Sequence, residues 1–128
     1  MTGEEVIRET WRRWNAGDRE LFPELIDPEL EVHSHLTGGV YRGEERVREW
    51  MAEIDQQFDG WELVIDRIRM PTEGRALVRG SIRAHGRASG IALDEPAAWI
   101  VELRGGRILE VHNFVGRDAI EAAEASAS

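Results

Sequence analysis

The fold of this chain is decided by residues 61–115, which read WELVIDRIRM PTEG RALVRGSIRAHGR ASG IALDEPAAWIVEL RGG RILEVHNFV. Apolar residues recur at every second position of the four longer segments, as they do in strands that bury one face. The three short segments contain the glycines and the proline that favour turns. The stretch therefore predicts four successive antiparallel strands, over Trp61–Met70, Arg75–Arg87, Ile91–Leu103 and Arg107–Val115.

The N-terminal part of the chain shows helical spacing instead. Thr2 and Glu5 are placed as a capping box, and the apolar stripe behind them predicts a helix that ends near Asn15. Asp18 can cap a second, short helix, which is expected to end at Asp27–Pro28 because the residue before a proline avoids helical backbone angles. This second helix would bury Leu21, Phe22, Leu25 and Ile26.

A first strand, a third helix and a closing helix complete the expected elements. Residues Leu30–Leu36 alternate like a half-buried strand, and Asp118–Glu124 permits a short last helix. The third helix follows Gly43 and places five apolar residues on one side: Val47, Trp50, Met51, Ile54 and Phe58. Helices followed by a run of antiparallel strands indicate an α+β fold, here one domain over residues 1–128 whose curved sheet carries the N-terminal helices on one face.

The composition excludes several kinds of chemistry. The chain has 128 residues and no cysteine, and its 16 basic residues are all arginine. Disulfides, thiolate nucleophiles, cysteine-based metal sites and lysine Schiff bases are therefore excluded. The net charge of -9 opposes binding to nucleic acids and to anionic membranes. Because the sequence shows neither a signal peptide nor an apolar run of about 20 residues, we expect a cytoplasmic protein.

Four short segments on these elements carry a family resemblance: Trp14–Asp18, Val40–Gly43, Arg87–Gly90 and Gly106–Glu110. With them the chain resembles the SnoaL-like branch of the nuclear transport factor two-like superfamily, which includes relatives of the ketosteroid isomerases and polyketide cyclases. The resemblance implies a cone-shaped curved sheet, with the N-terminal helices on its concave face, around a pocket for a small, apolar organic molecule. It also implies a homodimer formed through the outer face of the sheet.

The catalytic residues of those relatives do not transfer to this chain. Counted from the shared segments, the tyrosine and the carboxylate base of ketosteroid isomerases fall on Thr10 and Ser34, and the oxyanion acid falls on Ala98. The aspartate of some SnoaL-like cyclases falls on Asn113, an amide that cannot act as a base. Two functions therefore stay open: an enzyme of the isomerase, cyclase or hydratase type, and a non-catalytic ligand-binding or protein-interaction domain of the same fold.

His33 and His35 are the candidate catalytic residues. They lie two residues apart on the first strand, so their side chains point the same way, about 6 to 7 Å apart. A shared metal ion would need further ligands from Glu31, His85, Glu110 or His112. No known ligand spacing joins these residues. We therefore expect a polar strand face with no metal and no cofactor.

The predicted pocket combines aromatic walls with a few small or polar groups, and its lining is expected to include Trp14, Ser34, Trp50, Phe58, Ala98 and Asn113. Mostly apolar pockets with few polar groups are typical of small-molecule sites. Asn113 could hold a carbonyl or enolate through its amide. The second face of the sheet would carry Trp99, Val101 and Leu103, which we expect a homodimer to bury.

Overall fold

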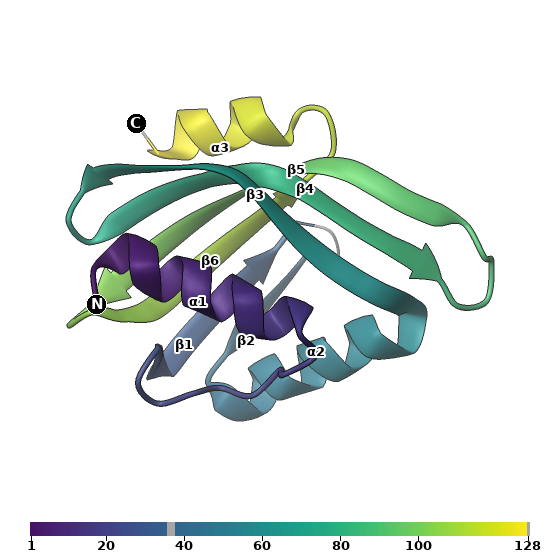
Figure 1. The fold of residues 1–128 in the computed structure, drawn as a ribbon, viewed down its shortest axis with the longest axis horizontal. Coiled ribbons are helices and arrows are strands. Elements are labelled where there is room, and N and C mark those ends of the chain that lie inside the picture. Colours follow the sequence, from purple (N-terminus) through teal and green to yellow (C-terminus); the bar gives the residue numbers. More distant parts are fainter. Residues whose placement is uncertain (36–37, 128) are drawn as a thin grey trace.

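The computed structural model describes residues 1–35 and 38–127 and shows an α+β fold (Figure 1). The described residues form three helices and one sheet of six strands in the order β2-β1-β6-β5-β4-β3. In chain order the elements are α1 (Gly3–Asn15), β1 (Ile26–Ser34), β2 (Gly39–Arg42), α2 (Glu44–Gln57), β3 (Phe58–Thr72), β4 (Arg75–Gly86), β5 (Ala92–Arg104), β6 (Arg107–Val115) and α3 (Ala119–Ala127). The predicted fold class is confirmed, with one addition: the sheet is mixed, because β1 runs parallel to β6.

The curved sheet separates two layers of helix (Figure 1). α1 and α2 pack against one face, which we call the inner face, and α3 packs against β4, β5 and β6 on the outer face. The larger apolar core lies between the inner face and the first two helices. A smaller cluster under α3 consists of Leu77, Ala98, Ile100, Phe114 and Ala123. No helix within the described ranges combines the length and the apolar character needed to span a bilayer.

Local signals placed most elements correctly. α1 begins at the predicted capping box, in which the Thr2 N–H donates to Glu5 Oε1 (2.8 Å) and the Glu5 N–H donates to Thr2 Oγ1 (3.2 Å). α2 buries most of its predicted apolar stripe, although Phe58 leaves the helix and begins β3. The four strands predicted within residues 61–115 are β3 to β6, and the closing helix is α3.

The prediction of a second helix is wrong. Residues 18–25 contain only a turn, in which the N–H groups of Leu25 and Ile26 both donate to Phe22 O. The turn does not continue as a helix because the sheet takes the next backbone group: the Ile108 N–H donates to Leu25 O (2.8 Å). Leu21, Leu25 and Ile26 are buried and Phe22 is partly buried, but they lie in a turn and at the start of β1 instead of on a helix.

The first strand is longer than predicted and has an unpredicted neighbour. β1 begins at Ile26, before the predicted start at Leu30, and continues through Pro28. It pairs with β2, which begins at Gly39, where the sequence indicated only a break. The predicted last residue of the strand, Leu36, lies outside the described residues.

The large residues of β5 lie on the face of the sheet opposite to the one predicted. Trp99 and Val101 belong to the larger core and Leu103 packs against it, so all three lie on the inner face. The pairing with β4 explains this, because Trp99 lies opposite Val78 and Val101 lies opposite Ala76, and paired residues share a face. These three residues therefore do not form an exposed apolar surface for a dimer.

An ion pair at the start of β1 ties this strand to the turn between β5 and β6. The Asp27 carboxylate, which is 2% exposed, accepts hydrogen bonds from the Glu29 N–H (2.9 Å) and from Arg104 Nη2 (3.1 Å), and Arg107 Nη2 lies 3.7 Å away. The hydrogen bond from Glu29, followed by that from Arg104, holds the pKa of Asp27 below its ordinary value, although desolvation opposes the shift.

We expect Asp27→Asn to lower the free energy of unfolding at pH 7, whereas Glu29→Gln, which removes an exposed partner of Arg104, should change it little. Because the pKa of Asp27 is depressed in the folded state, its stabilisation is present above the ordinary pKa of about 4 and is lost as the pH falls through the folded-state value. Urea unfolding from pH 7 to 3 should show the wild-type and D27N curves converging. Curves that stay parallel would contradict this role.

Candidate functional site

A cavity lies between the inner face of the sheet and the helices α1 and α2. Its volume is about 100 Å³, compared with the roughly 10–15 Å³ that one water molecule needs. The buried lining consists mainly of tryptophans and aliphatic side chains, and the aliphatic ones include Leu25, Leu30, Val47 and Ile108. All five tryptophans of the chain line the cavity: Trp11, Trp14, Trp50, Trp61 and Trp99.

The tryptophans form walls that join separate elements. Trp11 of α1 meets Trp99 of β5 edge to face, with ring centroids 5.7 Å apart and planes at 86°. Trp14 of α1 and Trp50 of α2 lie 6.2 Å apart. Rings held in this way supply large, rigid apolar surfaces, which suits a flat or compact organic ligand.

Four polar atoms of the lining residues lack a hydrogen-bond partner: Arg19 Nε at the exposed end, and three atoms deeper in the lining. The three deeper atoms are Trp11 Nε1, Trp50 Nε1 and Asn113 Oδ1, for which none of the described residues supplies a partner. Trp14 differs, because its Nε1 donates to Trp61 O (3.2 Å). Apart from Arg19 at the exposed end, the lining residues therefore hold two unpaired indole N–H donors and one unpaired acceptor among largely apolar side chains.

Charged side chains mark the exposed end of the cavity. Four of them belong to its lining: Arg13, Asp18, Arg19 and Glu20. Arg19 lies over the Trp14 ring, 4.3 Å from its centroid, and forms an ion pair with Asp55. Desolvation lowers the pKa of Arg19, which nevertheless stays charged as arginines do. Asp18 and Glu20 are exposed, so the carboxylates among the described lining residues lie at the surface rather than in the buried part.

The structure brings only part of the predicted lining to the cavity. Trp14, Trp50 and Asn113 line it, as expected. The described lining does not include Ser34 or Phe58: Ser34 is buried on the inner face, whereas Phe58 packs on Trp61 with ring centroids 4.7 Å apart.

Ala98 is misplaced in the prediction. It is buried in the cluster under α3 on the outer face, because it neighbours the inward-facing Trp99 and successive strand residues point to opposite faces. The position that corresponds to the oxyanion acid of ketosteroid isomerases therefore does not face the cavity in this chain.

Trp11, Trp61 and Trp99 are lining residues that the sequence did not indicate. The helical stripe of α1 contained Trp11, and Trp61 began a predicted strand, but neither pattern distinguishes ordinary core from a cavity wall. Trp99 was assigned to the wrong face.

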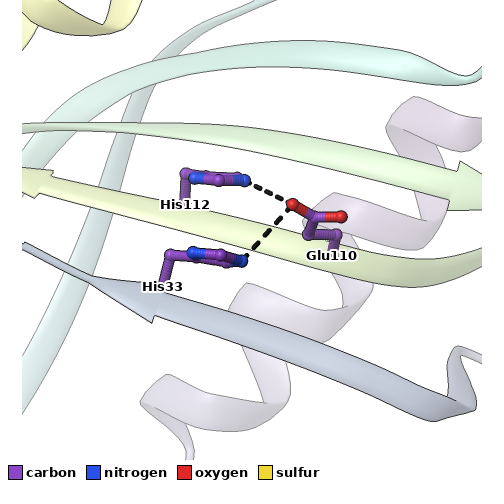
Figure 2. Close-up of side chains that lie close together, drawn as sticks. All are labelled: His33, Glu110 and His112. Atoms are coloured by element: carbon purple, nitrogen blue, oxygen red, sulfur yellow. Dashed lines mark hydrogen bonds and ion pairs between the residues drawn. The ribbon is translucent and has the colours of Figure 1, made fainter. Parts of the chain in front are cut away.

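The two candidate histidines lie on the outer face, away from the cavity, and they do not form a pair. His33 of β1 stacks instead on His112 of β6, with ring centroids 4.1 Å apart and planes at 12°. Both rings turn Nε2 toward Glu110 Oε1, at 3.5 Å from His33 and 2.5 Å from His112 (Figure 2). His33 Nε2 also lies 2.5 Å from Glu31 Oε1.

His35 has a different environment from His33. Its ring stacks on Phe114, with centroids 4.1 Å apart. Desolvation, followed by the charges of His112 and His33, lowers the pKa of His35.

The residues that could hold a metal ion in the described part of the chain are His33, Glu110 and His112, whose ligand atoms all lie within 4.8 Å of one another. The sequence offered Glu110 and His112 only as further ligands, because their position beside His33 depends on strand pairing.

Comparison with known proteins agrees with this architecture. Residues 7–111 match the family model of the SnoaL-like domain. No curated protein matches the chain.

Solved structures resemble the chain over nearly its whole length. A protein from Jannaschia sp. CCS1, provisionally named a SnoaL-like polyketide cyclase, has 18% identity and a TM-score of 0.78, covering 98% of this chain and 91% of its own. A nuclear transport factor two-like protein from Burkholderia thailandensis has 17% identity and a TM-score of 0.80, covering 97% and 98%. A protein from Catenulispora acidiphila with a ketosteroid isomerase-like fold has 16% identity and a TM-score of 0.75, covering 98% and 95%. Since the family model spans most of the residues and these folds extend over nearly all of them, the chain belongs to the SnoaL-like domain family.

Proposed function

We propose that this SnoaL-like protein binds a small, largely apolar organic molecule in the tryptophan-lined cavity, and that the molecule carries both an oxygen acceptor and a hydroxyl donor. The observation that carries the proposal is the unpaired state of Trp11 Nε1, Trp50 Nε1 and Asn113 Oδ1 among the described residues. A buried polar group without a partner costs about 1–3 kcal/mol. A ligand that supplies the partners recovers part of this cost, which a hydrocarbon cannot do.

Binding without turnover is favoured over catalysis. The indole donors could polarise a bound carbonyl, as isomerase, cyclase or hydratase chemistry requires. Such chemistry also needs a group that moves a proton. The carboxylates of the described lining are those of Asp18 and Glu20 at the exposed end, and the lining position matched to the tyrosine of ketosteroid isomerases holds Thr10.

A cationic ligand is the second candidate. The structural relative from Catenulispora acidiphila is described in complex with trimethylamine. Tryptophan faces attract cations as well as apolar groups. The two unpaired indole N–H donors favour a neutral, oxygen-bearing ligand in this chain, and trimethylamine serves as the competing probe.

Three ligands of similar size test the proposal: cyclohexanone, cyclohexanol and methylcyclohexane. Trp50→Phe removes an N–H donor and keeps an aromatic ring, so it should weaken binding of the ketone by about 1–3 kcal/mol relative to the hydrocarbon. Asn113→Leu removes an acceptor and should weaken binding of the alcohol, relative to the hydrocarbon, by a similar amount, about 1–3 kcal/mol. Calorimetric titration and quenching of tryptophan fluorescence measure these affinities.

Trp14→Phe is the matched control, because Trp14 Nε1 already donates to Trp61 O. It should change the affinities for the three ligands alike. The proposal is overturned if none of the three binds, or if W50F weakens ketone and hydrocarbon equally. Tighter binding of trimethylamine than of the ketone would assign the cavity to a cationic ligand.

Proton exchange tests turnover separately. An isomerase would exchange the α-protons of bound cyclohexanone with deuterated water. We expect no exchange above the rate in buffer, as measured by NMR, because the described lining has no buried base. Exchange that Asp18→Asn abolishes would show that the chain is an enzyme.

We also propose that the protein is cytoplasmic and forms a homodimer. The dimer contact proposed here does not involve Trp99, Val101 and Leu103, the residues expected from the sequence. α3 packs on β4, β5 and β6, which leaves the outer face of β1 and β2 beside it. Val40 lies in that part, opposite His33 in the β1–β2 ladder, and is 43% exposed. An apolar residue at this position supports contact with a second copy.

Sedimentation equilibrium of the intact chain tests the assembly. The wild type should show twice the chain mass of 14.5 kDa at micromolar concentration. Val40→Glu should shift it to the single-chain mass, because a charge would be buried in the contact. Ile91→Glu, which alters an equally apolar exposed residue outside β1 and β2, should leave the mass unchanged. A single-chain mass for the wild type, or the same response to both variants, would rule this contact out.

A further inference from the structure

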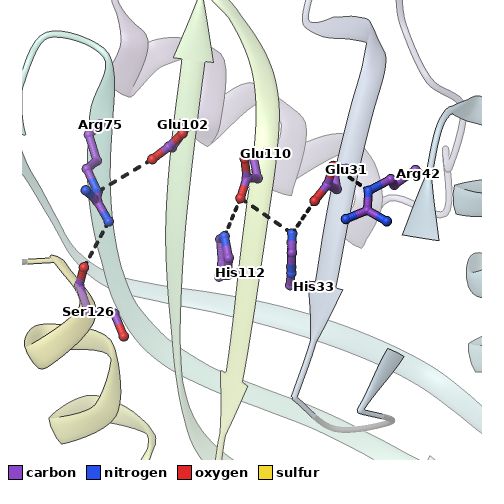
Figure 3. Close-up of polar contacts among 8 residues, drawn as sticks. All are labelled: Glu31, His33, Arg42, Arg75, Glu102, Glu110, His112 and Ser126. Atoms are coloured by element: carbon purple, nitrogen blue, oxygen red, sulfur yellow. Dashed lines mark hydrogen bonds and ion pairs between the residues drawn. The ribbon is translucent and has the colours of Figure 1, made fainter. Parts of the chain in front are cut away.

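A row of charged residues crosses the outer face of the sheet. Strand pairing places Glu31, Glu110 and Glu102 side by side on β1, β6 and β5, with Arg42 of β2 at one end and Arg75 of β4 at the other (Figure 3). Arg42 Nε lies 3.0 Å from Glu31, and Arg75 Nε lies 3.9 Å from Glu102. The row therefore has more negative than positive groups.

Glu110 is the carboxylate in this row that no arginine neutralises. Its ion-pair partners among the described residues are the two histidines, His33 and His112. Like charges on directly paired strand positions destabilise a sheet. The centre of the row is therefore the point at which a bound cation would stabilise the sheet most.

The two histidines converge on this carboxylate from adjacent strands. His33 and His112 are register partners in the parallel β1–β6 ladder, so their rings stack and present the same nitrogen in the same direction (Figure 2). The side chains of His33, Glu110 and His112 are 23%, 28% and 28% exposed. Each ligand atom is thus held by the sheet and is still open to solvent on one side.

The distances are close to those of a metal site. In a tetrahedral zinc site with bonds of about 2.0–2.2 Å, two ligand atoms lie roughly 3.3–3.5 Å apart. His33 Nε2 and Glu110 Oε1 are 3.5 Å apart. His112 Nε2 and Glu110 Oε1 are hydrogen-bonded at 2.5 Å, and a metal in place of the shared proton would require them to separate by about 1 Å.

We propose that His33, His112 and Glu110 form a binding site for a divalent transition-metal ion on the outer face of the sheet. Two imidazoles and one carboxylate suit zinc and the neighbouring first-row ions better than magnesium or calcium, which prefer oxygen ligands alone. Three protein ligands leave one coordination position open to solvent. Glu31, held by Arg42, lies 2.5 Å from His33 Nε2, so a metal ion on this nitrogen would replace that hydrogen bond, and the Glu31 carboxylate adds to the negative charge of the site.

The site is independent of the ligand proposed for the cavity, because it lies on the other face of the sheet. The competing interpretation is a hydrogen-bonded network in which each histidine donates a proton to a glutamate and no metal binds. The two interpretations differ in the response of the protein to zinc.

Zinc titration of the intact, chelator-treated chain is the test. Isothermal calorimetry should show one Zn²⁺ bound per chain, and the melting temperature should rise with zinc concentration as RT ln(1 + [L]/Kd) requires. His112→Ala and Glu110→Gln should each weaken zinc binding by more than about tenfold, because each removes a direct ligand. Glu110→Gln keeps the size of the side chain, so it tests the site even if His112→Ala impairs folding.

His35→Ala is the matched control. His35 directly follows the last residue of β1, two positions after His33, and stacks on Phe114 outside the cluster. This variant should keep the zinc affinity within about twofold of the wild type. The site is disproved if the wild type binds no zinc, if zinc does not raise its melting temperature, or if H35A loses as much affinity as H112A. Stoichiometry is counted per chain, and Val40 stays unchanged in these titrations because it is the register partner of His33.

Discussion

The parallel pairing of β1 with β6 is the constraint on which both candidate sites depend. It joins two segments that lie far apart in the sequence and sets Val32 beside Val111 and His33 beside His112. Because side chains alternate along a strand, the same register puts the valines on the inner face and the histidines on the outer face. A shift of one residue would reverse both assignments, so the histidines would no longer stack on the outer face and the valines would no longer face the cavity.

The cavity depends on how the helices meet this sheet. Trp11 and Trp14 come from α1, Trp50 comes from α2, and Trp61 and Trp99 come from β3 and β5. These five rings enclose the cavity between the helices and the sheet. Two of their N–H groups have no partner among the described residues, which is a cost that a purely structural core would avoid.

The outer face is divided between two kinds of packing. Under α3, Leu77, Ile100 and Phe114 form a small apolar cluster with Ala123. Beside it, the row from Arg42 to Arg75 is polar, and Arg75 Nη2 links this row to α3 through the carbonyl of Ser126 (2.9 Å). The apolar surface that alternation alone would place on this side of the sheet is thus largely covered by the chain's own last helix, and the remaining surface carries the charged row and the exposed Val40.

The sequence by itself determined the elements whose signals are local. These signals are the Thr2–Glu5 capping box, the stripe of α2 and the period-two segments of β3 to β6, each of which involves residues close together in the chain. The four segments that carry the family resemblance, and with it the fold class, are short and local as well. For the candidate site, the same signals reached Trp14, Trp50 and the inward position of Asn113.

Only the tertiary structure decided what depends on partners distant in sequence. Residues 18–25 have an apolar spacing that fits a helix and a turn equally well, and the bond from Ile108 to Leu25 O selects the turn. The register with β4 decides that Trp99 faces inward and Ala98 outward, and the periodicity within β5 does not contain this information. The pairing of His33 with His112, rather than with His35, likewise follows from which strand lies next to β1. Backbone hydrogen bonds between strands set these registers, and a linear pattern of side chains does not record them.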